Sequence, residues 1–593
     1  MTEAAARKPH TLRIETGDLS ADFVDGDLVD VRWAGVEVIQ RIYVAVRDEA
    51  WNTIPARISG VQVSHDGGEV VVDYDAEHEH AGISFAWHGR VRASSAGTIS
   101  SEMRGVAGSD FAYCKIGFNV HHGLSTHAGR RFRCRTLDGL WEGVFGADLE
   151  PQLVREGTLT AMTPHFDRLE VDLDGVEVAL DFEGDRFEMQ DHRNWADANW
   201  KSYGTPLEFG FPMTALKGDE IFQRVTTSVS GRGASRPLTA EAGIVLDDAV
   251  SPGTLPSIGH LLTGMPTDAE LVRLSALAPA HLRVDVHPGD DVGLVMAQAA
   301  RVADELDATL ELGLFLRPDL VAEDMGPVTE ALTGAGARLE RVLVLAETSG
   351  FSAFRGACPP DVGAAVRRAL GHAGITMPRI VSGTSQFFVD INRDRPDYSQ
   401  LDGLVFAMNP QVHACDDRSL MQNVHAIPHI VDFARRLYPG VDVVLSPVDL
   451  VGREGPFPAG PTADGGPPAN IDPRQASDFC AAWTVAALAQ MAACGATSAT
   501  FFELVGPRGL IDADLTYPVF DVAALLGELG VRPLVGVRVE RTEDVAVLAF
   551  GGGAGVDLVV ASTSAAPSRV RLPDGSECDL GPYQVLHREV PAS

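Results

Sequence analysis

The chain has 593 residues, of which 45% are hydrophobic and 22% charged, a composition typical of a soluble globular protein that is too long for one hydrophobic core. Its formal net charge of −34 argues against sequence-independent nucleic-acid binding, which needs fields of Lys and Arg, and against attachment to an anionic membrane. The seven cysteines are scattered without a CxxC pair, and the N-terminal stretch lacks the apolar core of a signal peptide. We therefore expect a cytoplasmic protein whose partner is a small molecule.

Residues 1–240 are predicted to form an antiparallel β-sandwich domain. Short runs of Val, Ile, Phe and Tyr alternate with polar residues, as in VDVRWAGVEVIQRIYVAVRD, and DG, GG and EG turns separate the runs. The Asp174-Gly175 pair, with alternating residues on both sides, predicts a hairpin. Because almost no helical pattern interrupts these runs, two packed sheets are the expected architecture.

A polar segment near the end of this domain, FEMQDHRNWADANWKSYGTPLEFGFP at residues 187–212, does not follow the strand pattern. Polar side chains crowd around Trp195 and Trp200; they are Glu188, Asp191, His192, Arg193, Asn194, Asp197, Lys201 and Tyr203. The segment is either a solvated loop whose tryptophans pack at a domain junction, or a loop that reaches over the active face of the next domain. In the second case Trp would stack on a sugar ring, and Arg and Asn would donate hydrogen bonds.

Residues 241–530 are predicted to form a (β/α)8 TIM barrel, because eight apolar runs alternate with amphipathic helical patterns. Strands are expected at Ser257–Thr263, His281–Val286, Thr309–Leu316, Arg341–Ala346, Arg379–Val389, Gly403–Met408, Val441–Leu445 and Ser498–Phe502. No GxGxxG follows a strand and no GxxxxGK[ST] occurs, so we expect no nucleotide and no other cofactor. Residues 531–593 alternate again and predict a small C-terminal β-sandwich domain.

Polar residues follow most of the predicted barrel strands, at the rim where TIM barrels hold their chemistry. They are Asp285 and His287 after the second strand, Glu347 after the fourth, Asp390, Asn392 and Arg393 after the fifth, Gln411, His413 and Asp416 after the sixth, Ser446 and Asp449 after the seventh, and Glu503 after the eighth. Any one of them could be a helix cap or a satisfied polar group. Their convergence favours an active-site face.

One scheme for this set is glycoside hydrolysis. Glu347 and Glu503 each end an apolar run, and they would flank a sugar bond, one as acid and the other as nucleophile or base. A metal site built from His413, Asp416, Glu347 or Glu503 is geometrically possible, but none of these residues is part of an HxH or HxxxH spacing, so we predict no metal. A serine nucleophile also lacks support, because the chain has no GxSxG elbow.

The other scheme is the opening of a lactone by water. Asp390 or His413 would act as general base, and Asn392 and Arg393 would donate hydrogen bonds to the oxyanion. The strand ends offer these groups beside one another in sequence, at residues 390–393 and 411–416.

Three segments resemble the D-apionate lactonase family: FEMQDHRNWADANWKSYGTPL, FFVDINRDRP and NPQVHACDDRSLMQNV. The corresponding family patterns are FEMEDQRNWTDAS followed by K, Y and TPL, then F-x-E-L-N-R-x-R-P, then PQVHAFD ahead of a helix. The resemblance spans the β-domain and the barrel. It implies a glycosidase-like barrel fold and hydrolysis of D-apionolactone to D-apionate in carbohydrate catabolism.

Carried over by position, the resemblance marks two sets of site residues. In the first segment they are Glu188, Asp191, Arg193, Asn194, Trp195, Lys201 and Tyr203, and in the other two they are Asp390, Asn392, Arg393, Gln411, His413 and Asp416. The chain departs from the pattern at Gln190 and His192, which replace an acid and an amide, and at Trp200. Asp390 stands where the pattern has Glu, and a carboxylate shorter by one methylene changes the geometry offered to a substrate.

Three functions remain open from the sequence. The first is a sugar-lactone hydrolase with His413 or Asp390 as base, in which Glu347 and Glu503 position water and hydroxyls. The second is a glycoside hydrolase that uses Glu347 and Glu503 as its carboxylate pair. The third is a non-catalytic carbohydrate-binding protein, which would have exposed aromatic platforms without convergent acids. A homo-oligomer is compatible with each.

The Pro- and Gly-rich stretch at residues 455–473, GPFPAGPTADGGPPANIDP, follows the seventh predicted strand. That position, on the expected active face, favours a lid over the substrate. The alternative is a connection with no part in catalysis.

Overall fold

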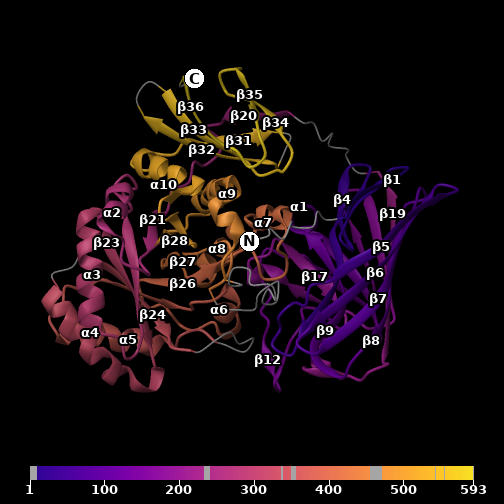
Figure 1. Ribbon diagram of the computed structural model, residues 1–593, viewed down its shortest axis with the longest axis horizontal. Coiled ribbons are helices and arrows are strands. Elements are labelled where there is room, and N and C mark those ends of the chain that lie inside the picture. Colours follow the sequence, from indigo (N-terminus) through magenta and orange to yellow (C-terminus); the bar gives the residue numbers. More distant parts are fainter. Residues whose placement is uncertain are drawn as a thin grey trace. The chain divides into compact units, whose positions relative to one another are not determined.

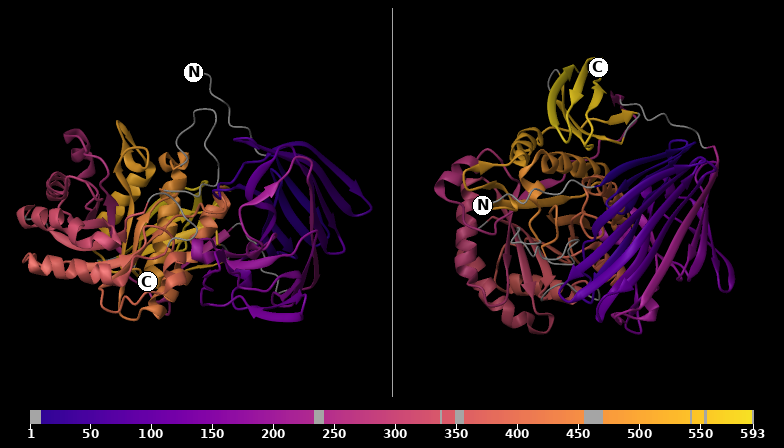
Figure 2. Two further views of the ribbon diagram at one scale, coloured as in Figure 1. Left: turned by 90° about the horizontal axis from the view of Figure 1, so that it is seen from below. Right: turned by 45° about the vertical axis from the view of Figure 1, so that its right-hand side comes forward.

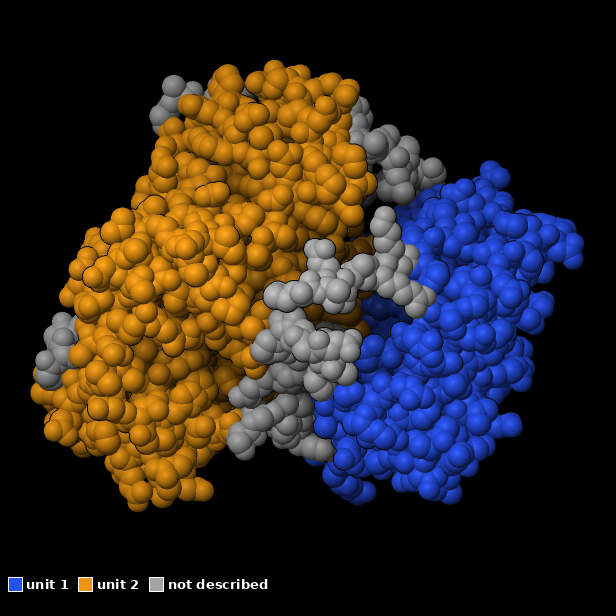
Figure 3. Space-filling view, in the orientation of Figure 1, with its two compact units in different colours: residues 1–193, 198–238, 456–462 blue, residues 194–197, 239–455, 463–593 orange. Residues whose placement is uncertain are grey.

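A computed structural model describes residues 10–232, 241–335, 338–348, 356–453, 470–540, 543–552 and 555–591, and the chain folds as two compact units. In the described ranges, the N-terminal unit comprises residues 10–193 and 198–232, and the barrel unit comprises residues 194–197 and the described residues from 241 to 591 (Figure 3). Residues 194–197 of the polar segment thus belong to the barrel unit. No helix within the described ranges is both long and apolar enough to cross a bilayer.

Two antiparallel sheets form the N-terminal unit, as the alternating sequence predicts (Figures 1 and 2). In order across the first sheet, the strands are β1 (Thr11–Thr16), β2 (Leu19–Val24), β3 (Asp27–Trp33), β4 (Val36–Asp48), β9 (Phe111–Gly123), β17 (Asn199–Tyr203) and β16 (Glu188–Asp191), with β18 (Met213–Ala215) also paired to β9. The second sheet runs β11 (Gly139–Val144), β10 (Arg131–Thr136), β14 (Phe166–Asp172), β15 (Val176–Glu183), β19 (Glu220–Gly231), β8 (Thr98–Ala107), β7 (Ile83–Ser94), β6 (Glu69–His80) and β5 (Arg57–Asp66). Short elements complete the unit: α1 (Leu124–His127), β12 (Val154–Arg155) and β13 (Thr158–Leu159).

The predicted hairpin at Asp174-Gly175 is confirmed between β14 and β15. Leu173 and Val176 bond to each other through their backbones on either side of the pair. Asp174 and Gly175 have φ values of 54° and 90°, which suit a tight two-residue turn.

In the described part of the barrel unit, eight parallel strands close on themselves through the pairing of β21 with β28, which confirms the predicted TIM barrel (Figure 1). The strands are β21 (Ser257–Leu261), β22 (His281–Val286), β23 (Thr309–Leu316), β24 (Leu339–Ala346), β25 (Arg379–Gly383), β26 (Gly403–Met408), β27 (Asp442–Val448) and β28 (Ser498–Val505). The helices are α2 (Asp268–Leu274), α3 (Val292–Glu305), α4 (Val321–Ala335), α5 (Pro360–His372), α6 (Phe388–Asp394), α7 (Asp417–Asn423), α8 (Ala426–Leu437), α9 (Asp478–Cys494) and α10 (Pro518–Leu529). A hairpin of β29 (Gly509–Asp512) and β30 (Leu515–Thr516) extends the sheet beyond β28.

The predicted strand Arg379–Val389 is wrong over its second half. β25 ends at Gly383, and Phe388–Asp394 forms α6 instead. The Thr384 hydroxyl accepts a bond from the backbone N–H of Gln386 at 3.1 Å and donates to Asp390 Oδ2 at 2.9 Å, which turns the chain after the strand. Asp390 therefore lies in the first turn of a short helix and does not end a strand.

The barrel interior holds a buried ionic network. Glu311 on β23 is fully buried, and its Oε2 accepts from Arg341 Nη1 at 2.7 Å. Its Oε1 accepts from Ser446 Oγ at 2.9 Å and Thr500 Oγ1 at 3.0 Å. Burial alone would raise the pKa of Glu311, but His281 and Arg341 hold that pKa below its usual value. A buried apolar cluster on neighbouring strands comprises Leu343, Leu345, Val381, Val405 and Val444.

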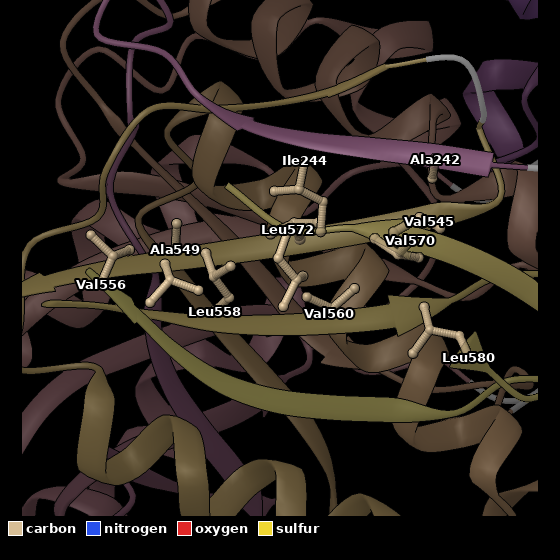
Figure 4. Close-up of a cluster of buried hydrophobic side chains, with 12 residues drawn as sticks. Ala242, Ile244, Val545, Ala549, Val556, Leu558, Val560, Val570, Leu572 and Leu580 are labelled. Carbon is tan, nitrogen blue, oxygen red and sulfur yellow. The ribbon is translucent and has the colours of Figure 1, made fainter. Parts of the chain in front are cut away.

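Two small sheets form the predicted C-terminal β-sandwich. One consists of β31 (Val537–Glu540), β20 (Glu241–Leu246), β34 (Ser568–Arg571) and β35 (Glu577–Leu580), and the other of β32 (Val545–Gly552), β33 (Gly555–Ser562) and β36 (Val585–Pro591). Apolar side chains from both sheets, among them Ile244, Leu558 and Leu580, form one buried cluster (Figure 4). Because β20 precedes the barrel in sequence, the domain boundary predicted at residue 241 falls at the start of a strand of this sandwich.

The stretch predicted as a lid, residues 455–473, lies mostly outside the described residues, which resume at Asn470. Of its last four residues, Asp472 and Pro473 lead into α9. The choice between a lid and a plain connection stays a prediction.

Candidate active site

The polar residues predicted at the strand ends lie along the carboxyl edge of the barrel, where all eight strands point the same way. Asp285 lies at the end of β22 and His287 follows it, Glu347 follows β24, Asp390, Asn392 and Arg393 lie on α6, Gln411, His413 and Asp416 follow β26, Asp449 follows β27, and Glu503 lies within β28. Their contacts divide them into separate groups along this rim.

His413 is the centre of one group. Its Nδ1 lies 2.6 Å from Asp197 Oδ2, and Asn423 Nδ2 donates to Asp197 Oδ1 at 3.3 Å and to the Pro410 carbonyl at 2.9 Å. The side chains of His413 and Asp197 are 9% and 1% exposed. An ionised Asp197 accepts the Nδ1 proton, so the imidazole is held in the tautomer whose Nε2 carries the lone pair. That nitrogen can take a proton from water.

Residues 194–197 are tied to the barrel beside this pair. Asn392 Nδ2 on α6 donates to Asn194 Oδ1 at 2.8 Å. The Trp195 ring lies 5.5 Å from the ring of Phe387 and meets the ring of His413 edge-on, at 6.2 Å and 90°. These contacts favour the interpretation in which part of the polar segment reaches the active face of the barrel.

Asp390 and Arg393 form a second buried group on α6. Arg393 Nη1 lies 3.6 Å from Asp390 Oδ1, and the two side chains are 4% and 5% exposed. Thr384 donates to the other oxygen of Asp390. Burial lowers the pKa of Arg393, whereas Asp390 and Asp394 oppose the change, and an arginine in a protein keeps its charge at neutral pH. Asp390 is therefore a carboxylate already engaged by a hydroxyl and a guanidinium.

A bulge in β28 sets the direction of Glu503. Phe502 has a φ of 46°, and the pairing of β21 with β28 shifts register at this point. The rings of Phe501 and Phe502 lie 6.5 and 6.3 Å from that of Trp483 on α9, so two consecutive side chains face the same outer helix. Glu503 consequently takes the inward direction that strict alternation would give to Phe502.

Glu503 belongs to a charge-balanced cluster of two carboxylates and two guanidiniums. Arg453 Nη1 donates to Glu503 Oε1 at 2.8 Å, and Arg453 Nε donates to Asp449 Oδ2 at 2.9 Å. Arg508 Nη2 lies 3.0 Å from Asp449 Oδ2. Burial alone would lower the pKa of Arg453, but Asp449 and Glu503 raise it well above its usual value.

Glu347 has different partners and a more open setting. His287 Nδ1 lies 2.8 Å from Glu347 Oε2, and the His287 ring stacks on Phe315 at 4.2 Å. The side chains of His287 and Glu347 are 46% and 31% exposed. β24 and β28 are four strands apart around the eight-stranded barrel, so Glu347 and Glu503 stand on opposite sides of the rim.

Three of the predicted substrate-binding residues have structural partners. Asp285 accepts from Arg283 Nε at 2.7 Å, and Gln411 Nε2 donates to the Leu450 carbonyl at 2.7 Å. Asp416 is the N-cap of α7, where its Oδ1 accepts the backbone N–H three residues further on at 2.9 Å. Each of these bonds shapes a strand end or a helix start.

The substrate-binding residues predicted in the N-terminal unit also have structural partners. Asp191 and Arg193 bind each other through bonds of 2.9 and 2.6 Å, and both side chains are fully buried. The Arg193 guanidinium lies 4.4 Å from the centre of the Trp200 ring. Lys201 lies 4.8 Å from the Tyr203 ring centre, on the first sheet.

Sequence reasoning missed four partners on the barrel rim: Asp197, Asn423, Arg453 and Arg508. Asp197 was visible only as one polar residue among many in its segment, and nothing in the spacing of the chain connects it with His413. Asn423 lies on α7 without a pattern around it. Arg453 and Arg508 follow β27 and β28 by a few residues, which is a signal that a search of the loops after each strand would have found.

Comparison with known proteins identifies the same family in both units. A family model described as "D-apionate lactonase, TIM barrel domain" matches residues 263–530, and one described as "D-apionate lactonase, N-terminal domain" matches residues 1–232. A curated D-apionate lactonase from Brucella anthropi is 27% identical over 536 residues, which cover 86% of this chain and 84% of that protein.

Solved structures give more distant similarities. The glycoside hydrolase family 30 subfamily 8 xylanase Xyn30A from Clostridium acetobutylicum is 12% identical, with 60% of this chain and 97% of that chain covered and a TM-score of 0.38. The galactose 1-epimerase from Lactobacillus acidophilus is 9% identical, with 39% and 97% covered and a TM-score of 0.27.

Proposed function

The chain belongs to the D-apionate lactonase family, and we propose that it is a hydrolase that opens a sugar lactone to the free aldonate, with D-apionolactone as its substrate. The observation that carries the proposal is the buried His413–Asp197 pair on the barrel rim, with 2.6 Å between Nδ1 and Oδ2. An imidazole oriented by a carboxylate is a general base suited to water at neutral pH.

The reaction needs one proton to be taken up and returned. Water attacks the lactone carbonyl carbon, and His413 Nε2 takes a water proton while the carbonyl oxygen becomes an oxyanion. The bond from that carbon to the ring oxygen then breaks, and the imidazolium returns its proton to the ring oxygen, which becomes a hydroxyl. Asp197 stays ionised and stabilises the imidazolium formed in between.

Arg393 is the cation that we assign to the oxyanion. It stays charged at neutral pH, and its buried setting strengthens each hydrogen bond that it donates. Asp390, the other base considered from the sequence, already accepts from Thr384 and lies beside Arg393. Its role in this proposal is to orient Arg393, and that leaves His413 as the base.

Glycoside hydrolysis by Glu347 and Glu503 has less support from the geometry. The two residues lie four strands apart around the barrel, and each is bonded to a basic group of its own, His287 or Arg453. A glycosidase pair must flank a single bond, with roughly 5–10 Å between the carboxyl groups.

The test is hydrolysis of a panel of D-apionolactone, other aldonolactones and aryl glycosides by the full chain and its variants. We expect lactone opening without glycoside cleavage. Asp197→Asn should lower kcat about 10²- to 10³-fold with little change in KM, and should shift the acid limb of the pH–rate profile, because the imidazolium loses its counter-charge. A purely structural role for Asp197 would leave the shape of that profile unchanged.

The matched control is Asp449→Asn, which removes a buried carboxylate from the cluster around Arg453 on the same rim. It should leave the pH–rate profile in place. Cleavage of aryl glycosides that is abolished by Glu347→Gln or Glu503→Gln would instead make the protein a glycosidase and refute the lactonase proposal.

A reducing, cytoplasmic setting is part of this proposal. All seven cysteines are free thiols, and most of them are buried. Burial raises the pKa of Cys114 to about 11 and that of Cys134 to about 12, so neither is a reactive thiolate.

A further inference from the structure

The loop that carries His413 has no regular structure of its own. Residues 409–416, all of them described, connect β26 to α7 without forming a helix or a strand. His413 lies in the middle of this loop, with its Nδ1 2.6 Å from Asp197 Oδ2. Because no backbone ladder fixes such a loop, side chains from neighbouring segments have to hold the imidazole at this distance.

Arg474 binds the second half of this loop. It lies in the 3-10 turn Pro473–Ala476, which precedes α9. Its Nη1 donates to the Cys415 carbonyl and to Asp417 Oδ1, both at 2.9 Å. The first acceptor lies two residues after His413, and the second is the first residue of α7. One nitrogen therefore joins the loop to the helix that follows it.

Asp472 binds both Arg474 and the first half of the loop. Its carboxylate accepts from Arg474 Nε at 2.9 Å and from Arg474 Nη2 at 2.6 Å, and also from the side-chain amide of Gln411. Gln411 lies two residues before His413 and also donates to the Leu450 carbonyl at 2.7 Å. Arg474 and Asp472 together thus contact the loop on both sides of His413.

This ion pair is itself fixed in place. The side chains of Arg474 and Asp472 are 19% and 3% exposed. Burial alone would raise the pKa of Asp472, but its bonds with Arg474 hold that pKa below its usual value, so the carboxyl group is ionised at neutral pH. The side chain of Gln475 donates to the Gly509 carbonyl at 3.0 Å, which ties the same turn to β29.

A tyrosine of the C-terminal sandwich contacts the same group of residues. The ring of Tyr583 lies 4.9 Å from the ring of Phe479, and the Arg474 guanidinium lies 5.2 Å from the centre of the Phe479 ring. Burial raises the pKa of Tyr583, and the Asp417 carboxylate beside it adds to the change. Side chains of the barrel and of the sandwich therefore both restrain Arg474 and Asp417.

We propose that Arg474 is a positioning residue: together with Asp472 it fixes the loop that holds the imidazole of His413 in place. A guanidinium suits this role because its donors point in fixed directions and serve several acceptors at once. A displacement of about 1 Å at a reacting group can lower a rate about 10²-fold, so a loosened loop should lower kcat. The inference rests on the proposed function, in which His413 is the general base.

The first experiment compares D-apionolactone opening by the wild type, Arg474→Ala and Arg474→Lys, all as the full chain. In Arg474→Ala we expect kcat to fall about 10- to 100-fold with KM unchanged, and Arg474→Lys should lie between it and the wild type. Guanidinium chloride at millimolar concentrations should restore part of the loss, because the free cation replaces the missing group. No recovery, or equal recovery with sodium chloride, would overturn the inference.

The matched control is Arg317→Ala. Arg317 also follows a barrel strand and is also paired with an aspartate, Asp324, but it has no printed bond to the loop of His413. It should keep the kcat of the wild type. Asp417→Ala, at a half-exposed side chain, serves as a second variant in case Arg474→Ala does not fold, and its kcat should fall severalfold. Wild-type kcat in both Arg474→Ala and Asp417→Ala would overturn the inference.

A double variant tests whether Arg474 acts through His413. If it does, adding Arg474→Ala to His413→Asn should lower kcat by no more than about twofold further, because the group that it positions is already gone. A further loss as large as that of Arg474→Ala alone would overturn the inference, since Arg474 would then act independently of His413.

A measurement without substrate separates this inference from the proposed function. The Nδ1 proton of His413, bonded to Asp197, should give a downfield resonance in the proton NMR spectrum that His413→Asn lacks. We expect the resonance to broaden or vanish in Arg474→Ala and to persist in Arg317→Ala. An unchanged resonance in Arg474→Ala would overturn the inference. If no lactone is hydrolysed but the resonance still depends on Arg474, the proposed function fails and the positioning role stands.

Discussion

Buried charge is held differently in the interior of the barrel and at its rim. In the interior, Glu311 bonds to Arg341, Ser446 and Thr500, all of them on barrel strands whose register fixes the geometry. At the rim, His413 takes its carboxylate partner from Asp197, 216 residues away in sequence. All partners in the interior network come from barrel strands. The rim pair instead includes Asp197, which in sequence lies between β16 and β17 of the N-terminal unit.

The difference separates stability from activity. The interior network contributes to the stability of the fold. Protonation of Glu311 is unfavourable there, because it would leave the buried charge of Arg341 without its ion-pair partner. A histidine with one oriented nitrogen is built to gain and lose a proton. Variants in the barrel interior should therefore change the free energy of unfolding, and variants at the rim should change kcat.

The largest effect is expected from His413→Asn. It removes the general base and keeps a side chain that can donate to Asp197, so kcat for lactone opening should fall roughly 10³-fold or more without a change in melting temperature. Steady-state kinetics and differential scanning calorimetry measure the two quantities.

The matched control for His413 is His287→Asn on the same rim. His287 is 46% exposed and is bonded to Glu347, so kcat should change less than tenfold. A greater loss in His287→Asn than in His413→Asn would reverse the assignment and move the chemistry to the side of the barrel that holds Glu347.

The interior should respond in the opposite way. Glu311→Gln removes the charge that Arg341 is bonded to, and leaving one buried charge unpaired costs about 3–5 kcal/mol of stability. KM for the lactone should not change. Glu330→Gln, on the exposed side of α4, is the control and should leave stability within about 0.5 kcal/mol of the wild type.

The pH dependence of Glu311→Gln sharpens this prediction. The pKa of Glu311 is lower in the folded state than in the unfolded state, so its contribution is fully present above pH about 4.3 and is lost as the pH falls through the folded pKa. The gap in stability between wild type and variant should therefore narrow in acid. Chemical denaturation of both proteins between pH 3 and 7 measures this difference in the free energy of unfolding. A difference that stays constant over that range would contradict a role for the ionised carboxylate.

The N-terminal unit contains a buried basic group, Lys115, whose pKa is shifted so that it loses its charge more easily. Burial lowers the pKa of Lys115 to about 7, although nearby carboxyl groups favour its charged form. The charged and titratable groups around it are Glu188, Asp185, Cys114 and Arg47, and Tyr203 packs on it. Since an unfolded lysine has a pKa of about 10.4, the unfolded state binds more protons between pH 7 and 10.4, and the stability of the folded state rises with pH in that window.

Lys115→Met should remove this dependence. Between pH 7 and 9 the free energy of unfolding of the wild type should rise relative to that of the variant by about 1 kcal/mol per pH unit, and below pH 7 the variant should be the more stable of the two. Urea denaturation at several pH values measures the difference. Parallel curves for the two proteins would mean that Lys115 stays charged in the fold.

The sequence predicts the barrel better than its active rim, and the reasons are physical. β22, β23 and β26 match the predicted ranges to the residue. β26 is a continuous apolar run with polar boundaries, as is typical of a buried parallel strand, whereas β22 and β23 are mostly apolar and carry the buried charges Arg283 and Glu311. Phe387-Phe388-Val389 has the same composition but lies at the start of α6, because one hydroxyl bond from Thr384 turns the chain there. The position of His413 after a strand could be predicted, whereas its pairing with Asp197 could not, since only the tertiary fold joins residues so far apart.

The smallest effect is expected at Asp416, which lies at a position of the family motif. Substitutions there test whether this residue contacts substrate. The structure has Asp416 as the N-cap of α7, accepting from the Ser419 N–H and hydroxyl. Asp416→Ala should therefore cost about 1 kcal/mol of stability and leave KM unchanged, and Asp416→Ser should restore most of the loss, because serine caps a helix without a charge. A tenfold rise in KM in both variants at unchanged stability would show instead that the carboxylate binds substrate. In that case α7 would carry a residue that takes part in the reaction as well as residues that only stabilise the fold.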